Sequence, residues 1–168
     1  MTRGHRAAWL LLGAAIAGID LWTKQLWIYP YPVPGGEPLL QQDGVLVDGW
    51  LYVRTVWNVG AVWSLRLNAS LLLWATALAL PILIAWIFLP KGTRAAEVAG
   101  KSLILGGAAG NLYDRWQYGA VRDFIDVCFG DPAGWHWPTF NVADIALVIG
   151  IALLLLGGPR RETARAAA

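Results

Sequence analysis

Long stretches without charge dominate the pattern of apolar and polar positions along this chain. The clearest runs from Ala69 to Leu89, 21 residues without a charged side chain, and a helix needs about 20 apolar residues to span a bilayer. Pro81 lies inside this run, which membrane helices tolerate. A second run, from Phe140 to Leu156, is interrupted only by Asn141 and Asp144. Both runs predict membrane-spanning helices.

Two weaker apolar runs complete the pattern. The run from Ala7 to Trp27 carries Asp20 and Lys24 near its far end, and the run from Ala95 to Tyr113 is charged only near its start. Bulky and polar residues follow the first run where a signal-peptide cleavage site needs small ones, so we expect a retained helix. We therefore predict an all-α membrane protein with one domain, residues 1–168. Its four transmembrane helices are expected at about 7–27, 69–89, 95–113 and 139–157.

The segments between these helices, about 28–68 and 114–138, have a different pattern. The first begins rich in Pro and Gly ("YPYPVPGGEP") and then becomes strand-like. Its apolar positions predict two short strands broken at Asp48-Gly49, and they are Val45, Val47, Leu51, Val53 and Val56. We expect a small β-rich domain on the outer membrane face, with Trp residues near the helix ends at the membrane interface.

Charge adds an orientation to this picture. Only 14% of the residues are charged, against about 25% in soluble domains. Eight of the 13 Lys and Arg residues precede the first helix, surround the loop before the third, or follow the fourth. Because positive residues accumulate in cytoplasmic loops, both termini should be cytoplasmic. The net charge of +2 is therefore a topology feature, and we expect no nucleic-acid partner.

Polar residues gather at the opposite, outer ends of the predicted helices. Ionisable groups at such depths are costly and mark functional sites. Two of them, Asn141 and Asp144, are three residues apart and share a helix face, with Thr139 as a possible cap for that helix. The others are Asp20, Lys24, Asn111, Asp114, Arg115, Asp123 and Asp126.

Two carboxylates held close together in a partly dry site cannot both ionise easily. One pKa rises, and acid and base roles become available together. Such a pair can activate water against a peptide bond without a nucleophilic side chain or a metal. Asp123 and Asp126 in "VRDFIDV" both qualify as the partner of Asp144. If this segment is extended, they point to opposite faces, and spacing alone leaves the choice open.

Other chemistries have less support in the sequence. The single cysteine, Cys128, has no basic cluster or helix N-terminus beside it to activate its thiol. The two histidines form no zinc-binding pattern. We expect no metal and no cofactor.

Five ordered segments resemble the motifs of the lipoprotein signal peptidase family, also called signal peptidase II. They are "DLWTK" (20–24), "NVGAVW" (58–63), "GGAAGNLYDR" (106–115), "VRDF" (121–124) and "FNVAD" (140–144). The resemblance covers nearly the whole chain. Leu21, Val62-Trp63 and Arg122 depart from the residues usual in the family.

The resemblance implies an aspartic endopeptidase of the bacterial inner membrane. It would remove the signal peptide from prolipoproteins, just before a cysteine that carries diacylglyceryl. The catalytic pair would be Asp123 and Asp144. Residues that support the site and bind substrate would be Asn58, Gly60, Asn111, Arg115 and Asn141, and structural polar residues would be Asp20, Lys24 and Asp114. The expected partners are the prolipoprotein and membrane lipid, and the expected state is a monomer.

Two rival interpretations use the same carboxylates, and a third, a non-catalytic membrane assembly factor, would tolerate Asp→Asn changes at positions 123 and 144. A small transporter or proton or cation relay subunit predicts acids at mid-membrane on several helices, whereas here they cluster at one face. A metal-dependent membrane hydrolase would use Asp123, Asp126, Asp144 and His136, and it would be sensitive to a chelator.

Overall fold

The computed structural model describes residues 3–28, 44–62, 65–66, 68–88, 95–131 and 133–156. Four helices and five strands follow one another along this part of the chain. In order they are α1 (Arg3–Ile28), β1 (Gly44–Val47), β2 (Leu51–Asn58), β3 (Ala61–Val62), β4 (Leu65–Arg66), α2 (Ala69–Phe88), α3 (Ala95–Tyr118), β5 (Val121–Val127) and α4 (Val142–Leu156).

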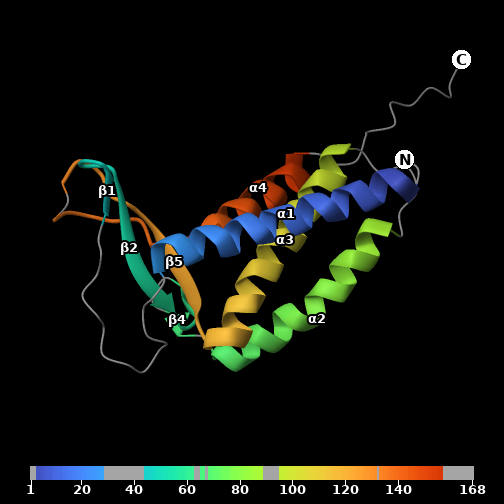
Figure 1. Cartoon of the computed structure of the whole chain (residues 1–168), viewed down its shortest axis with the longest axis horizontal. Coiled ribbons are helices and arrows are strands. Elements are labelled where there is room, and N and C mark those ends of the chain that lie inside the picture. Colours follow the sequence, from blue (N-terminus) through green and yellow to red (C-terminus); the bar gives the residue numbers. More distant parts are fainter. Residues whose placement is uncertain are drawn as a thin grey trace, which may run out of the picture.

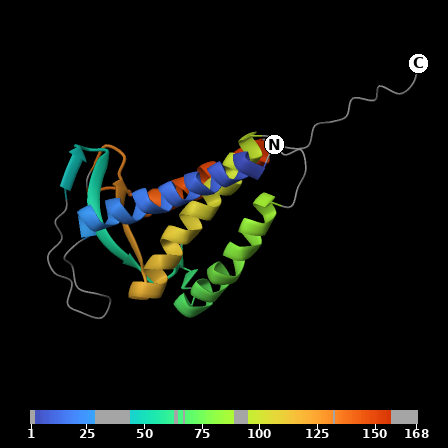
Figure 2. The same ribbon diagram turned by 45° about the vertical axis from the view of Figure 1, so that its right-hand side comes forward.

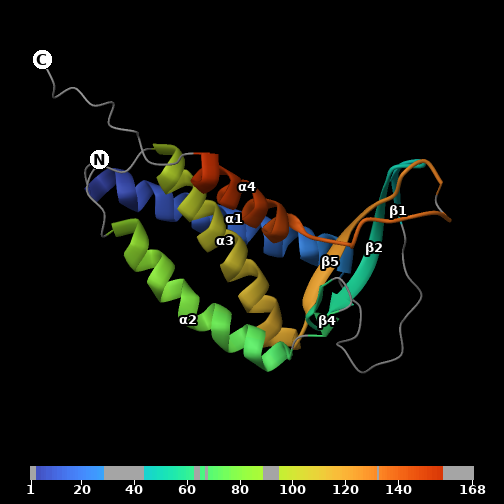
Figure 3. The ribbon, with the colours of Figure 1, turned by 180° about the vertical axis from the view of Figure 1, so that it is seen from behind.

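The helices form a bundle, and the sheet lies at one end of it (Figure 1). Helix α3 is central, since it packs against α1, α2 and α4. Figure 2 shows α3 between α2 and the α1–α4 pair, and α2 packs mainly against α3 with a smaller contact to α1. The N-terminal end of α1 and the C-terminal end of α4 lie together at the end of the bundle far from the sheet (Figure 3). This arrangement places the far ends of α1 and α3 and the start of α4 against the sheet.

Four helices form where the apolar runs predict them; α1 begins four residues earlier than predicted, at Arg3, and the end of α3 and the start of α4 also differ from the prediction. Helix α3 continues to Tyr118 instead of ending near Tyr113. Its last turns carry Asp114 and Arg115, which hydropathy penalises, but Asp114 is fully buried against cationic partners. Helix α4 begins at Val142 and not at Thr139. Tertiary pairing therefore moved both boundaries.

Two of the four helices have the length and composition of membrane helices. Two spans, Ala7–Trp27 and Ser70–Ile87, are long and apolar enough to cross a bilayer, and α4 is a shorter apolar helix. Their outward side chains are apolar as well, with Leu78 and Ile82 of α2 about two-thirds exposed at 67% and 68%. Such surfaces suit lipid and not water.

The predicted strands are confirmed, and "VRDFIDV" is extended. Strands β1, β2 and β5 form an antiparallel sheet in the order β1-β2-β5, with an irregularity in β2 between Val53 and Val56. Strands β3 and β4 form a separate pair. The segment around Phe140 runs antiparallel to β5, because Phe140 and Ile125 exchange backbone hydrogen bonds. This contact brings the start of α4 beside β5.

Two glycines of "GGAAGNLYDR" let α1 approach α3 closely. A side chain at Gly106 would meet the carbonyl oxygen of Gly13 at 2.5 Å, and one at Gly110 would collide with the Asp20 carboxylate. Small residues of this spacing are typical of helix pairs in membranes. Close packing here is what admits a buried acid between the two helices.

Several sequence predictions lie outside the described residues. They concern the Pro- and Gly-rich stretch 29–38, the basic loop 89–94 and the basic tail 157–168.

Candidate active site

Asp123 lies on β5, beside the end of β2. Asn58 pairs with Val121 across the sheet, and Val121 and Asp123 share a face of β5. The side-chain amide of Asn58 donates to Asp123 Oδ2 at 3.0 Å. Gly60, with a φ of 107° that favours glycine, donates its N–H to Asn58 Oδ1 at 2.9 Å. This turn fixes the Asn58 amide with its donor toward Asp123.

Asp144 lies in the first turn of α4, where Asn141 is the helix cap. The backbone N–H of Asp144 donates to Asn141 Oδ1 at 3.0 Å, and the N–H of Asn141 donates to Asp144 Oδ2 at 3.2 Å. This is a reciprocal capping box. The prediction that Thr139 caps the helix was wrong. Asn141 takes that place because its side chain also contacts α3 and β5.

Two asparagines join the two carboxylates. The amide of Asn141 lies 2.6 Å from Asp123 Oδ1 and 3.1 Å from Asn111 Oδ1. The amide of Asn111 donates in turn to Asp144 Oδ1 at 2.9 Å. Asp123 and Asp144 therefore face one another through neutral amide donors, and we call these four residues the dyad cluster.

The dyad cluster keeps Asp123 from ionising easily. Burial, reinforced by the nearby Asp144 carboxylate, raises the pKa of Asp123 from 3.8 to about 7. Hydrogen bonds from Asn58 and Asn141 oppose this shift, because they favour the charged form, as does the charge of Lys24. At neutral pH the cluster can therefore hold a proton beside a carboxylate, as acid–base catalysis requires.

Arg115 lies one turn beyond Asn111 on α3. Its guanidinium donates to the Asn111 carbonyl at 3.4 Å, and its charge interacts with Asp144 and Asp123. Arg115 therefore supplies positive charge to the site from the side of α3.

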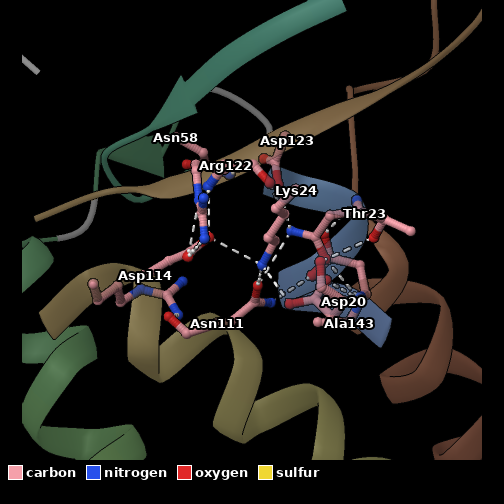
Figure 4. A network of polar contacts seen from close by, with 12 residues as sticks. Asp20, Thr23, Lys24, Asn58, Asn111, Asp114, Arg122, Asp123 and Ala143 are labelled. Atoms are coloured by element: carbon pink, nitrogen blue, oxygen red, sulfur yellow. Dashed lines mark hydrogen bonds and ion pairs between the residues drawn. The ribbon is translucent and has the colours of Figure 1, made fainter. Parts of the chain in front are cut away.

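The predicted structural residues form a second cluster around Lys24, next to Asn111 of the first (Figure 4). Lys24 Nζ lies 2.7 Å from Asp20 Oδ2 and 3.0 Å from Asp114 Oδ2, and all three side chains are fully buried. Lys24 also donates to Asn111 Oδ1 at 3.0 Å. The same lysine thus binds the two acids and orients an amide of the dyad cluster.

Asp20 and Arg122 extend this second cluster to α4 and β5. Asp20 accepts the backbone N–H of Ala143 at 2.9 Å, a free donor in the first turn of α4. Arg122 binds Asp114 through Nη2 at 2.7 Å and Nε at 3.1 Å. We call Asp20, Lys24, Asp114 and Arg122 the ion-pair cluster. Arg122 therefore binds Asp114 and not Asp123, although it precedes Asp123 in the chain.

An apolar groove opens beside Asp144. It has a volume of about 330 Å³. Its lining residues are Trp137, Phe140, Asp144, Ile145, Val148 and Ile149. The sequence did not single out the apolar members of this set, although their spacing of one helical turn along α4 and the two nearby aromatics could have indicated a shared face.

Asp126 takes no part in the dyad cluster. It is buried, with His136 Nδ1 2.9 Å from Oδ1 and Arg54 Nη2 3.4 Å from Oδ2. Cys128 is also buried, and its thiol donates to the Gly49 carbonyl. Among the residues described, no three His, Cys, Asp or Glu side chains are grouped to hold a metal. The absence of a metal requirement stays a prediction.

The fold is that of known membrane enzymes. Two solved structures, both described as bacterial membrane enzymes studied by the in meso method, match with TM-scores of 0.73 and cover 90% of this chain. The matches cover 87% and 92% of those chains at 24% identity, so the likeness concerns the fold alone. A membrane enzyme is the class that fits a polar centre built among apolar helices.

Sequence comparison then gives the family. The profile of Signal peptidase (SPase) II matches residues 12–158, and the chain belongs to this family of peptidases. A lipoprotein signal peptidase of Xanthomonas campestris is 37% identical, with 93% of each chain covered. One of Blochmanniella pennsylvanica is 37% identical over 88% of this chain and 86% of its own. One of Rhodopirellula baltica is 35% identical over 88% and 70%. The predicted family is confirmed.

Proposed function

We propose that this protein is an aspartic endopeptidase that removes the signal peptide from diacylglyceryl-modified bacterial prolipoproteins, just before the lipidated cysteine. The observation that carries the proposal is the dyad cluster. The amides of Asn111 and Asn141 join Asp123 to Asp144, Asp144 lines the apolar groove, and burial raises the pKa of Asp123 to about 7. Its curated relatives are named lipoprotein signal peptidases.

The dyad starts the reaction with one shared proton. One carboxylate takes a proton from water as the water oxygen attacks the scissile carbonyl carbon, while the other donates its proton to the carbonyl oxygen. The resulting tetrahedral diol then loses a hydroxyl proton to the second carboxylate. The first donates its proton to the leaving nitrogen as the C–N bond breaks, and this restores the singly protonated pair.

The neighbouring residues hold this pair in place. Asn58, Asn111 and Asn141 donate to the two carboxylates without adding charge, so that one proton can stay on the dyad. Asn58 is itself oriented by Gly60. Arg115 offers a positive charge near the developing negative charge of the carbonyl oxygen.

The proposal also assigns the protein a cellular location and a membrane topology. We propose an inner-membrane protein of four transmembrane helices that acts as a monomer, with both termini in the cytoplasm. The sheet and the dyad cluster then lie near the outer face, where the scissile bond of a translocated prolipoprotein would be. The apolar groove on α4 would face the signal helix or the acyl chains of the substrate.

Cleavage by the purified protein tests the function. Wild-type protein in detergent, with a chelator present, is incubated with a diacylglyceryl-modified prolipoprotein, and the products are weighed by mass spectrometry. We expect a mature product that begins with the lipidated cysteine. A second reaction contains no chelator. If the protein does not cleave the substrate in either reaction, the proposed function is contradicted. If it cleaves only in the reaction without the chelator, the metal-dependent alternative is favoured.

A further inference from the structure

A third polar cluster lies on β5, separate from the dyad cluster. Asp126 is fully buried, and its carboxylate contacts the ring of His136 at 2.9 Å and the guanidinium of Arg54 at 3.4 Å. A carboxylate can only accept a hydrogen bond, so Nδ1 of His136 is the donor. Burying a charge in this way is costly unless its partners are kept in place. We call Arg54, Asp126 and His136 the Asp126 cluster.

The Asp126 cluster ties β5 to the segment that leads into α4. His136 forms an isolated bridge with Cys128, and the N–H of Trp137 donates to the Val127 carbonyl at 2.8 Å. Phe140 is fixed to Ile125 by two further backbone hydrogen bonds. The bond from His136 to Asp126 adds a side-chain tether at the point where this irregular segment leaves the sheet.

Trp137, the residue that follows His136, lines the apolar groove. Trp137 and Phe140 line the groove together with Asp144 and three apolar residues of α4. Phe140 is held by its own backbone bonds. Trp137, which is 45% exposed, is held by its N–H bond to Val127 and by an edge contact between its ring and Trp135. Because Trp137 follows directly after His136, the bond from His136 to Asp126 adds to what holds its main chain in place.

We propose that His136 is a positioning residue for substrate binding: its bond to Asp126 holds Trp137 as a wall of the groove that receives the lipidated prolipoprotein. This inference rests on the proposed function. His136 does not touch the dyad, so it acts on binding of the substrate and not on the chemical step. A mutation that removes only such binding raises KM and leaves kcat unchanged.

Three variants test the tether. His136→Phe keeps a ring and removes the hydrogen bond, so KM for the diacylglyceryl-modified prolipoprotein should rise about 10-fold with kcat within about twofold. His136→Asn places an amide donor near the position of Nδ1 and should restore KM to within about twofold of wild type. Trp137→Ala should raise KM as His136→Phe does. Trp74→Ala, at an exposed tryptophan of α2, is the matched control and should leave KM unchanged.

The combination of His136→Phe with Trp137→Ala gives the sharpest result. If His136 acts through Trp137, the double variant should have the KM of Trp137→Ala alone. Additive effects, equal KM for the Phe and Asn variants, or a fall in kcat would overturn the inference. If His136→Phe does not fold, Asp126→Leu, which removes the acceptor of this bond, takes its place: it should raise KM with kcat unchanged, and an unaltered KM would overturn the proposal. Because wild type is measured alongside, failure of the proposed function appears separately, as absence of any cleavage.

Discussion

The dyad cluster and the ion-pair cluster are neighbours, and both contain two buried or half-buried aspartates. In the dyad cluster the partners of Asp123 and Asp144 are neutral amides. In the ion-pair cluster Asp20 and Asp114 are matched by Lys24 and Arg122, two acids against two cations. Amide donors orient a carboxylate and leave its proton exchangeable, whereas ion pairs hold the charged form. The partners, and not the acids, separate a reactive pair from a structural one.

The largest effect on the fold is expected from Lys24→Met. It leaves Asp20 and Asp114 buried without their shared cation, and breaking a buried pair in this way costs about 3–5 kcal/mol. Thermal unfolding in detergent measures the loss. The control is Lys101→Met, since Lys101 is equally buried but its partner Glu97 is 34% exposed. Equal unfolding temperatures for the two variants would contradict the central place of Lys24.

The second-largest effect is expected from replacing Asn141. Asn141→Ala deletes both the cap of α4 and the donor to Asp123, so we expect a loss of about 1 kcal/mol of stability and about a 100-fold loss of kcat through misplaced carboxylates. Asn141→Ser separates the two roles, because Ser also caps helices but lacks the amide that donates to Asp123. It should keep most of the stability and still lose activity. An active Asn141→Ser variant would show that the donor is dispensable.

The pH dependence of activity should distinguish the dyad from the ion pairs. With the pKa of Asp123 at about 7, kcat/KM should fall as pH rises through about 7, because the dyad then loses its shared proton. Asn58→Ala removes a hydrogen bond that lowers this pKa, so it should move the fall to higher pH. A shift to lower pH would contradict the assigned role of Asn58.

The same raised pKa affects stability. Since the folded-state pKa lies above 3.8, the contribution of Asp123 to stability is fully present below about pH 3.8 and is lost as pH rises through about 7. Asp123→Asn cannot ionise and should therefore unfold at a higher temperature than wild type at pH 8, by more than at pH 5. No difference between the two pH values would mean that Asp123 ionises freely.

Arg122→Leu should have the smallest effect on catalysis, although it lowers stability. Asp114 keeps Lys24 and the backbone N–H of residue 122, so the loss should be about 1.5–3 kcal/mol, as for a hydrogen bond to a charged group. The pH at which kcat/KM falls should not move, because Arg122 binds Asp114 and not Asp123. A shift in the pH at which kcat/KM falls would show that Arg122 acts on the dyad cluster.

The sequence predicted the helices and strands better than it predicted which polar side chains contact one another. Apolar runs, three of them with a few charged residues, were sufficient to predict four helices, and alternation was sufficient to predict β1 and β2. The end of α3 was missed because hydropathy counts Asp114 as polar, although its pairing with Lys24, 90 positions away, lets the helix continue. The start of α4 was missed because Thr139 and Asn141 are both good caps, and contacts with Asn111 and Asp123 favour Asn141.

Site chemistry shows the same limit. The spacing of Asp123 and Asp126 left two candidates for the partner of Asp144, and only the resemblance to the family favoured Asp123. In the structure Asp123 shares Asn141 with Asp144, while Asp126 contacts His136. Nothing local in the sequence distinguishes a carboxylate that meets an amide from one that meets an imidazole, because both partners come from a later segment.

Turnover of three aspartate variants at saturating substrate tests the dyad most directly. Asp123→Asn, Asp144→Asn and Asp126→Asn are compared with wild type for cleavage of a diacylglyceryl-modified prolipoprotein, each shown to be folded by thermal unfolding. The dyad predicts no detectable cleavage by the first two variants and near wild-type kcat for Asp126→Asn. Wild-type turnover by either Asp123→Asn or Asp144→Asn would contradict it.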